Sequence, residues 1–387
     1  MNFDEIIERR NTHSSKWDMM EKLFGVPAEE GIAMWVADMD FRPPHAARQA
    51  LERMLDIGIF GYYGDDRSYH DAICWWMRSR HGWDVQPEWI FSTHGLVNGT
   101  ALCIDTFSEP GDDIVLFAPV YHAFARVIGA SGRGIAECRL AVDGSRYRFD
   151  FESYSARMTG REKIAILCSP QNPGGTVWRR DELRQMAEFC VRHNLILISD
   201  EIHNDLLMPG SRHMVTHVAA PEIEDRLVVL TATTKSFNLA GAHTGNVIIP
   251  DGRLRKRFAR RMEALGISPN SFGLFLAEAV YSPEGAAWVD AAMAYINENR
   301  KLFDACMNEI GVASMPLEAT YLAWVDFSGT GLSESEISER IKGRAKIAAN
   351  RGTTFGSGGE NFHRFNLATP RPVLEHAIER LRDAFAD

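Results

Sequence analysis

The chain has 387 residues, which is more than one hydrophobic core usually serves, so its length predicts two domains. Its net charge of -10 argues against a general nucleic-acid-binding protein, because neutralising phosphates requires clustered Lys and Arg. Hydrophobic residues at 45% and charged residues at 24% are ordinary for a folded globular protein.

The N-terminal residues 1–18 are polar and acidic, and they lack the apolar core of a signal peptide. No apolar run reaches the length of a membrane span. The six cysteines are scattered and form no CxxC pair, which favours reduced thiols in a core. We therefore expect a cytoplasmic protein without a membrane partner.

In chain order, residues 1–45 contain no long regular element and are expected to form an arm that joins the small domain or wraps onto a partner subunit. Residues 46–285 alternate short apolar runs with amphipathic helices, the pattern of a large α/β domain. The runs are nearly continuous in Val, Ile and Leu, as in a mostly parallel sheet with helices on both faces. The expected strands are 89–93, 114–118, 164–168, 195–199, 227–231 and 247–249, with a clear helix at 181–193.

From residue 286 the pattern changes, and residues 286–387 are expected to form a smaller α+β domain. A long helix is predicted at 288–310, followed by a strand in TYLAWVDF. A helix near 334–349, a strand at 362–366 and a helix at 371–385 complete the chain.

Five residues follow successive predicted strands and should meet at one edge, because ligands bind at the carboxyl ends of strands in open α/β sheets. Gly95 opens a helix whose free N–H groups could hold an anion. The next strand ends deliver an aromatic ring, an amide, a carboxylate and an amine. These groups belong to Tyr121, Asn172, Asp200 and Lys235.

Each of these residues has an ordinary explanation when taken alone. Asn172 lies between two prolines and could be no more than a turn-forming residue. Asp200 could cap a helix, and Lys235 could be a solvated lysine. Five coincidences at successive strand ends are harder to dismiss. Pyridoxal 5'-phosphate (PLP) explains the set, because it needs a lysine amine, a carboxylate for its ring nitrogen, a helix N-terminus for its phosphate and an aromatic ring to stack on.

Other motifs compete poorly with this interpretation. There is no GxxxxGK[ST] phosphate loop, and the glycine-rich stretches at 129–134 and 355–359 are interpreted as loops. His203, His213 and His217 show no HExxH or equivalent metal spacing. No metal is therefore expected, although two carboxylates near the N-terminus, Asp38 and Asp40, leave a cation as a minor alternative.

The motifs SPQNPGGTVW, ISDEIHNDL and TTKSFNLAG resemble the class I/II aminotransferase family of fold-type I PLP enzymes. The DEIH form of the aspartate motif, with WVADMDF and FGYYG, is similar to the cystathionine β-lyase or cysteine-S-conjugate β-lyase branch. The resemblance extends from about Trp35 to the RFN segment near the C-terminus, so it covers most of the chain.

The resemblance implies a role for each matching residue. Lys235 would hold the cofactor as a Schiff base and transfer the proton, Asp200 would bind the pyridine nitrogen, and Asn172 the phenolic oxygen. Tyr62 would reach the phosphate of a neighbouring subunit, which implies a homodimer. The substrate-binding residues implied are Arg364, which would clamp the carboxylate, Ala37 and Tyr121, which would also stack on the ring. The remaining cofactor-binding residues are Gly95, Leu96, Val97, His203 and Thr234.

Three positions depart from the family pattern, all around the phosphate. Ala232 stands three residues before the lysine, where many relatives have Ser, so Thr231, Thr233 or Thr234 would have to supply a hydroxyl. His243 stands where many aminotransferases have Arg, and His94 where Pro is frequent. We expect altered phosphate contacts.

The favoured reaction is β-elimination of a thiol from an S-substituted cysteine, giving pyruvate and ammonia. Transamination by the same residues is the alternative, because the same electron sink serves both reactions. A regulatory or binding protein that reuses the fold ranks lower, since both Lys235 and Asp200 are present.

Overall fold

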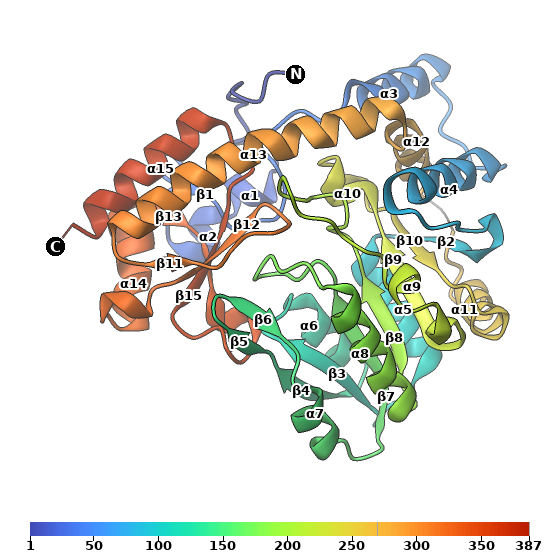
Figure 1. Cartoon of the computed structure of the whole chain (residues 1–387). Helices are drawn as coiled ribbons and strands as arrows, with labels where there is room; N and C mark the ends of the chain where they lie inside the picture. The colour runs from blue at the N-terminus through green and yellow to red at the C-terminus, as the bar shows by residue number, and fades with distance from the viewer. Residues whose placement is uncertain (269, 387) are drawn as a thin grey trace.

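A computed structural model describes residues 1–268 and 270–386, and its central feature is a seven-stranded sheet (Figure 1). Five neighbouring strands run parallel, and β10 is antiparallel to both strands beside it. The prediction of a mostly parallel central sheet is confirmed. The spatial order is β2 (Ile90–Thr93), β10 (Gly245–Ile248), β9 (Leu227–Thr231), β8 (Ile196–Asp200), β7 (Glu162–Cys168), β3 (Asp113–Ala118) and β4 (Gly134–Arg139).

Both faces of this sheet are covered, which explains why its central strands, β3, β7, β8 and β9, are mostly apolar. Val115 and Leu167 pack into the core on one face, and their neighbours Leu116 and Ile166 pack into the core on the other. The first face is covered by α7 (Phe151–Arg157), α8 (Arg180–Arg192) and α9 (Thr216–Ala219), and the second by α5 (Leu96–Phe107), α6 (Ala123–Ala130) and α11 (Gly252–Ala264).

The edge strand β4 was not predicted, and the interpretation of residues 129–134 as a loop is partly wrong. Gly129 lies in the last turn of α6, and Gly134 is the first residue of β4. The strand is polar and partly exposed, as edge strands often are, so it lacks the apolar run that marks the others. A short hairpin of β5 (Ala141–Asp143) and β6 (Arg146–Arg148) follows it. The second glycine-rich stretch is a loop after Phe355, as predicted.

The C-terminal part contains a four-stranded sheet, in the order β11 (Ala313–Ser314), β12 (Leu322–Asp326), β15 (Phe362–Asn366) and β14 (Asn350–Arg351). Its main helices are α13 (Pro283–Glu309) and α15 (Arg371–Ala384), which lie side by side in Figure 1. The predicted boundary between residues 285 and 286 falls in the first turn of α13 and, like the other domain boundaries, stays a prediction.

The helix predicted at 334–349 is wrong in its second half. Helix α14 (Glu334–Glu339) continues into a π-helical turn, Arg340–Arg344, and then gives way to β13 (Ile347–Ala348). Pairing with the N-terminal arm replaces the helix, because β13 runs parallel to β1 (Ile32–Ala33). A tertiary contact overrides the local pattern here.

The arm has only short regular elements, α1 (Ser15–Asp18), α2 (Met20–Phe24) and β1, as expected for residues 1–45. Through β1 it adds to the C-terminal part, and residues 35–41 then lead toward the large sheet. Among the helices of the described residues, none combines the length and apolar content that a membrane span needs. The remaining helices are α3 (His45–Ile57), α4 (Arg67–His81), α10 (Thr233–Ser236) and α12 (Ser271–Val280).

Candidate functional site

A cavity of about 950 Å³ opens at the carboxyl ends of the parallel strands, between the large sheet and the C-terminal part. Tyr62 does not line it: this side chain is fully exposed on the loop between α3 and α4. Every other predicted site residue lies on its wall, although their individual roles stay predictions. These residues are Ala37, Gly95, Leu96, Val97, Tyr121, Asn172, Asp200, His203, Thr234, Lys235 and Arg364.

The strand ends explain how the chain brings these residues together. Asp200 is the last residue of β8, and Lys235 lies in α10, four residues beyond the end of β9. Asn172 and Tyr121 follow β7 and β3 in the same way. Because these strands are parallel neighbours, the four side chains reach one edge of the sheet.

Helix α5 presents its N-terminus to the same cavity. Gly95 caps it with φ of +85°, a conformation that favours glycine. The Gly95 amide donates to the Thr93 carbonyl at 2.9 Å, whereas the next amides, at Leu96 and Val97, have no intrahelical acceptor by helix geometry. This end of the cavity is therefore suited to an anion.

The amine of Lys235 lies at the centre of the cavity wall. Its Nζ donates to the Ala37 carbonyl at 2.5 Å, and the Tyr321 hydroxyl donates to the same oxygen at 3.0 Å. Burial lowers the Lys235 pKa to about 8, with Arg364 adding to the fall and the carboxylates of Asp38 and Asp200 opposing it. At pH 7 about a tenth of the amine is therefore unprotonated, far more than for an exposed lysine.

Asp200 is buried and accepts a hydrogen bond from the Ile202 amide at 3.1 Å. Burial raises its pKa to about 7, and the neighbouring Glu201 adds to the rise, while the Ile202 amide and Lys235 oppose it. A buried carboxyl with so little compensation is suited to a cationic ligand group, which would restore its charge.

Arg364 fixes the orientation of Asn172. Its guanidinium donates to Asn172 Oδ1 at 3.0 Å and to the Trp35 carbonyl at 2.8 Å, and it lies 4.8 Å from the ring centre of Phe355. Because arginine cannot accept a hydrogen bond, Asn172 must turn its oxygen toward Arg364 and keeps its NH2 group for another partner. The Arg364 Nε is buried and has no partner within the described residues, so an anionic ligand could still be bound there.

Two rings of the cavity, those of His203 and Tyr121, are uncharged at neutral pH. Burial lowers the pKa of His203 to about 3, and its Nδ1 is another buried nitrogen without a partner in the described parts of the chain. Burial also raises the pKa of Tyr121. At the anion end, Thr234 lines the wall together with His94 and His243, whereas the Thr231 hydroxyl accepts a hydrogen bond from Asn246.

Sequence reasoning missed the residues that hold the 35–41 segment beside Lys235. Tyr321 lies in a predicted strand, and Asn238 and Asn366 lie in the quoted motifs, but the sequence assigns no function to any of the three. Both asparagines hydrogen-bond backbone groups of residues 36–41. Their positions in TTKSFN and RFN, close to Lys235 and Arg364, were the available signal.

Two of the three histidines considered as metal ligands are hydrogen-bonded to carboxylates of the protein. His213 hydrogen-bonds Glu201 at 2.8 Å, and His217 hydrogen-bonds Glu224 at 3.3 Å, whereas His203 faces the cavity. Across residues 1–268 and 270–386, no group of three or more His, Cys, Asp or Glu side chains is arranged to hold a metal. The carboxylates of Asp38 and Asp40 are paired with Arg9 and Lys16.

Comparison with known proteins gives matches over the whole chain. The family Aminotransferase class I and II matches residues 30–381. Cystathionine beta-lyase PatB of Bacillus subtilis (strain 168) is 38% identical over 100% of both chains. The structure of cystalysin from Treponema denticola, which contains a pyridoxal 5'-phosphate cofactor, has a TM-score of 0.95 at 33% identity, over 100% of this chain and 99% of that chain. The PLP-bound C-S lyase from Staphylococcus hominis has a TM-score of 0.92 at 27% identity, over 100% and 98%.

The raised pKa of Asp200 predicts a pH-dependent stability in the protein without cofactor. The native state holds this proton up to about pH 7, and the unfolded state releases it near pH 4, so ionisation costs stability as the pH rises between them. Asp200→Asn removes that cost. We expect the free energy of unfolding of the variant, relative to that of the wild type, to increase between pH 4 and pH 7 by about 4 kcal/mol at most. Above pH 7 the difference should change no further.

Urea unfolding of both proteins at several pH values measures this difference, and comparing them cancels the other titrating groups. A difference that does not change with pH would contradict the assignment of a raised pKa to Asp200.

Proposed function

Because the chain belongs to the class I and II aminotransferase family, we propose that it is a PLP-dependent C–S β-lyase. Its substrate would be an S-substituted cysteine of the cystathionine type, and its products a thiol, pyruvate and ammonia. The observation that carries the proposal is the meeting of Lys235, Asp200, Asn172 and Arg364 in one cavity. The full-length similarity to a cystathionine beta-lyase and to the structure of a PLP-bound C-S lyase supports this choice of reaction.

The residues present fit PLP. Asp200, a buried carboxyl that lacks a cationic partner, would hold the ring nitrogen, and the NH2 group left free on Asn172 would donate to the phenolic oxygen. The first amides of α5 would hold the phosphate, with Thr234 supplying a hydroxyl. Tyr121 and His203 would lie along the ring. When bound, the cofactor supplies an electron sink for charge that develops at the substrate Cα.

The protein supplies binding and proton transfer. Arg364 binds the substrate carboxylate, for which its buried and incompletely bonded guanidinium is suited. Lys235, whose pKa of about 8 leaves free amine near neutral pH, takes the proton from Cα. The Cβ–S bond then breaks and its electron pair leaves with the sulfur as a thiolate. Water is consumed as the three-carbon fragment ends as pyruvate and its nitrogen as ammonia.

Transamination is the second candidate, because the same lysine, arginine and aspartate would serve it. The family match favours it in general terms, since the family takes its name from this reaction. The two reactions differ in one requirement: an aminotransferase needs a keto acid as its second substrate, and a lyase does not.

We also propose a homodimer. Large apolar side chains are exposed around the end of α3, the loop that follows it and α12, including Ile57, Ile59, Phe60 and Phe272. Phe60 and Phe272 contact each other, with ring centres 5.6 Å apart, so the patch bridges the loop and α12. A patch of this kind favours association, and Tyr62 is fully exposed on the same loop, where it could reach a neighbouring subunit.

A reducing, cytoplasmic location is part of the proposal. All six cysteines are free, and five of them are buried. Free thiols are typical of proteins kept in reducing compartments.

Purified protein loaded with PLP should release pyruvate from cystathionine without any keto acid. Lys235→Ala should lose this activity by several orders of magnitude, together with the visible absorbance that arises from the cofactor's imine bond to the lysine, because both depend on its amine. Coupled assay of pyruvate with lactate dehydrogenase measures the rate. Turnover that starts only after a keto acid is added would favour the aminotransferase instead.

Arg364→Lys should reduce kcat/KM for cystathionine by about 10- to 100-fold, because an ammonium cannot reproduce a bidentate guanidinium bond to a carboxylate. Arg126→Lys is the matched control, since Arg126 lines the same cavity but is exposed. Initial rates over a range of substrate concentrations give the effect. Equal losses in the two variants would argue against Arg364 as the carboxylate-binding residue.

Phe60→Asp should shift the protein from dimer to monomer, because it places a charge in the middle of the apolar patch. Val142→Asp is the control: Val142 is exposed to a similar degree, on the β5 hairpin far from α3 (Figure 1). Light scattering coupled to gel filtration measures the mass. A wild-type protein that is monomeric at micromolar concentration would overturn the dimer.

A further inference from the structure

Residues 35–41 pass beside the cavity as irregular backbone whose carbonyl groups are satisfied largely by side chains. Asn366 donates to the carbonyls of Val36 and Asp38 at 2.7 and 2.6 Å. Asn238, three residues after Lys235, donates to the carbonyls of Met39 and Phe41 at 2.9 and 2.8 Å. A backbone held at this many points has little freedom to move.

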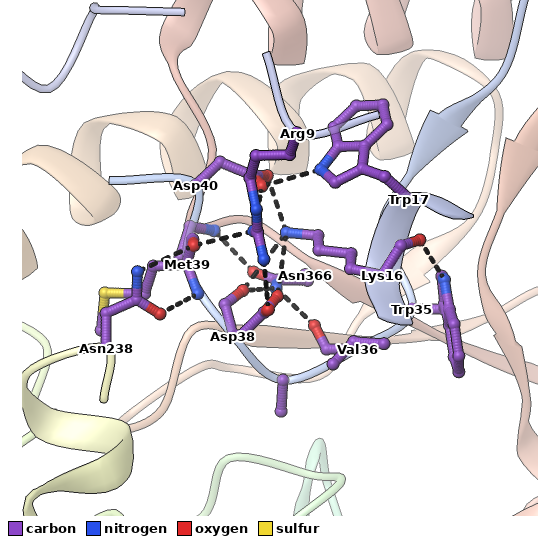
Figure 2. A network of polar contacts seen from close by, with 12 residues as sticks. Arg9, Lys16, Trp17, Trp35, Val36, Asp38, Met39, Asp40, Asn238 and Asn366 are labelled. Carbon is purple, nitrogen blue, oxygen red and sulfur yellow. Dashed lines mark hydrogen bonds and ion pairs between the residues drawn. The ribbon is translucent and has the colours of Figure 1, made fainter. Parts of the chain in front are cut away.

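A cluster of four charges, formed within the arm, holds the same segment (Figure 2). The Lys16 side chain is fully buried, and its Nζ lies 2.7 Å from Asp40 Oδ2 and 3.7 Å from Asp38 Oδ1. Arg9 bonds Asp38 Oδ2 at 2.7 Å and Asp40 Oδ1 at 2.6 Å. Trp17 also donates to Asp40, at 3.0 Å.

The two carboxylates of this cluster differ in how completely they are compensated. Asp40 accepts hydrogen bonds from Arg9, Lys16 and Trp17. Asp38 Oδ1 is buried and has no hydrogen-bond partner among the described residues. Asp38 is also the residue that follows Ala37, whose carbonyl accepts from Lys235 Nζ at 2.5 Å.

We propose that Asp38 is a positioning residue for Lys235. Anchored by Arg9 and Lys16, it fixes the Ala37 carbonyl as the acceptor of the free lysine amine and holds a negative charge beside it. The inference rests on the proposed function, in which this amine carries the cofactor and moves the proton. It gives the N-terminal arm, whose one residue in the predicted site is Ala37, a further part in the chemistry.

The charges around Lys235 agree with this role. Asp38 on the 35–41 segment and Asp200 at the end of β8 favour its ammonium form, whereas Arg364 on β15 and burial oppose it. His203 and Tyr321, the other titratable groups beside it, are uncharged near neutral pH because burial lowers the pKa of the first and raises that of the second. Asp40 is not among the groups that act on Lys235.

The experiment compares Asp38→Asn with Asp40→Asn, which remove equal charges from the same cluster. The full-length protein without cofactor is labelled with acetic anhydride from pH 6 to 10, and mass spectrometry follows the peptide that contains Lys235. Exposed Lys256 on α11 is the internal reference. Asp38→Asn should lower the Lys235 pKa and speed its labelling at pH 7 by about threefold or more, which corresponds to half a pH unit.

Asp40→Asn should leave the labelling of Lys235 unchanged, although both variants should lower the melting temperature by leaving Arg9 and Lys16 with one carboxylate fewer. Equal effects of the two variants on Lys235, or no effect of Asp38→Asn, would overturn the proposal. Labelling needs neither cofactor nor turnover, so it tests the role of Asp38 independently of the activity assay. An absence of pyruvate would contradict the proposed function but would not change the interpretation of the labelling rates.

Arg9→Met provides a test if Asp38→Asn does not fold. Arg9 is partly exposed, so its loss should be tolerated better, and it leaves the Asp38 charge less neutralised. The Lys235 pKa should then rise and its labelling at pH 7 should slow, which is the opposite sign to Asp38→Asn. Faster labelling would show that loosening of the cluster, rather than the charge of Asp38, controls Lys235, and would overturn the proposal.

Discussion

The contact between the Lys235 amine and the Ala37 carbonyl joins the two parts of the molecule at the wall of the cavity. Lys235 lies in α10, which directly follows β9 of the seven-stranded sheet. Ala37 lies in the segment that is hydrogen-bonded by Asn366, a residue of β15 in the four-stranded sheet. Asn238 fastens the same segment to the loop after Lys235. The wall of the cavity is thus built from both parts at once, and its shape follows from how they are joined.

Burial is the main electrostatic influence on this wall, and it acts in opposite directions on the two groups that titrate near neutral pH. It lowers the pKa of an amine, Lys235, and raises the pKa of a carboxyl, Asp200, so that both come within about a unit of pH 7.5. Neither group would be useful in this way at the surface. The apolar strands that form the sheet therefore also set the protonation of the groups at its edge.

The parts of the fold that were predicted are those in which local pattern and tertiary structure agree. Strands β7 and β9 are buried on both faces, so their apolar runs mark them, and the residues that follow them are the wall of the cavity. Strand β4 lies at an edge and carries polar residues, so no such run reveals it. Residues 345–349 look helical, but they pair with the arm more than 300 positions away.

The charge cluster could not have been predicted for a related reason. Asp38 and Asp40 lie in an apolar motif and are expected to pair with cationic side chains. The sequence does not show which of the 42 Lys and Arg residues these are. Nothing near Lys16 in the sequence indicates that its side chain is fully buried. The partners are identified only by the way the arm folds back on itself, which brings Arg9 and Lys16 to Asp38 and Asp40.

The pairing of β1 with β13 has a consequence for the order in which the chain folds. The paired strands lie more than 300 positions apart in the sequence, whereas neighbouring parallel strands of the large sheet are separated by short crossovers. Closing the longer loop costs more chain entropy, so the large sheet can form before the arm finds its partner. The carbonyl that faces Lys235 therefore belongs to a late-folding contact, and a chain that has folded only its large sheet would lack it.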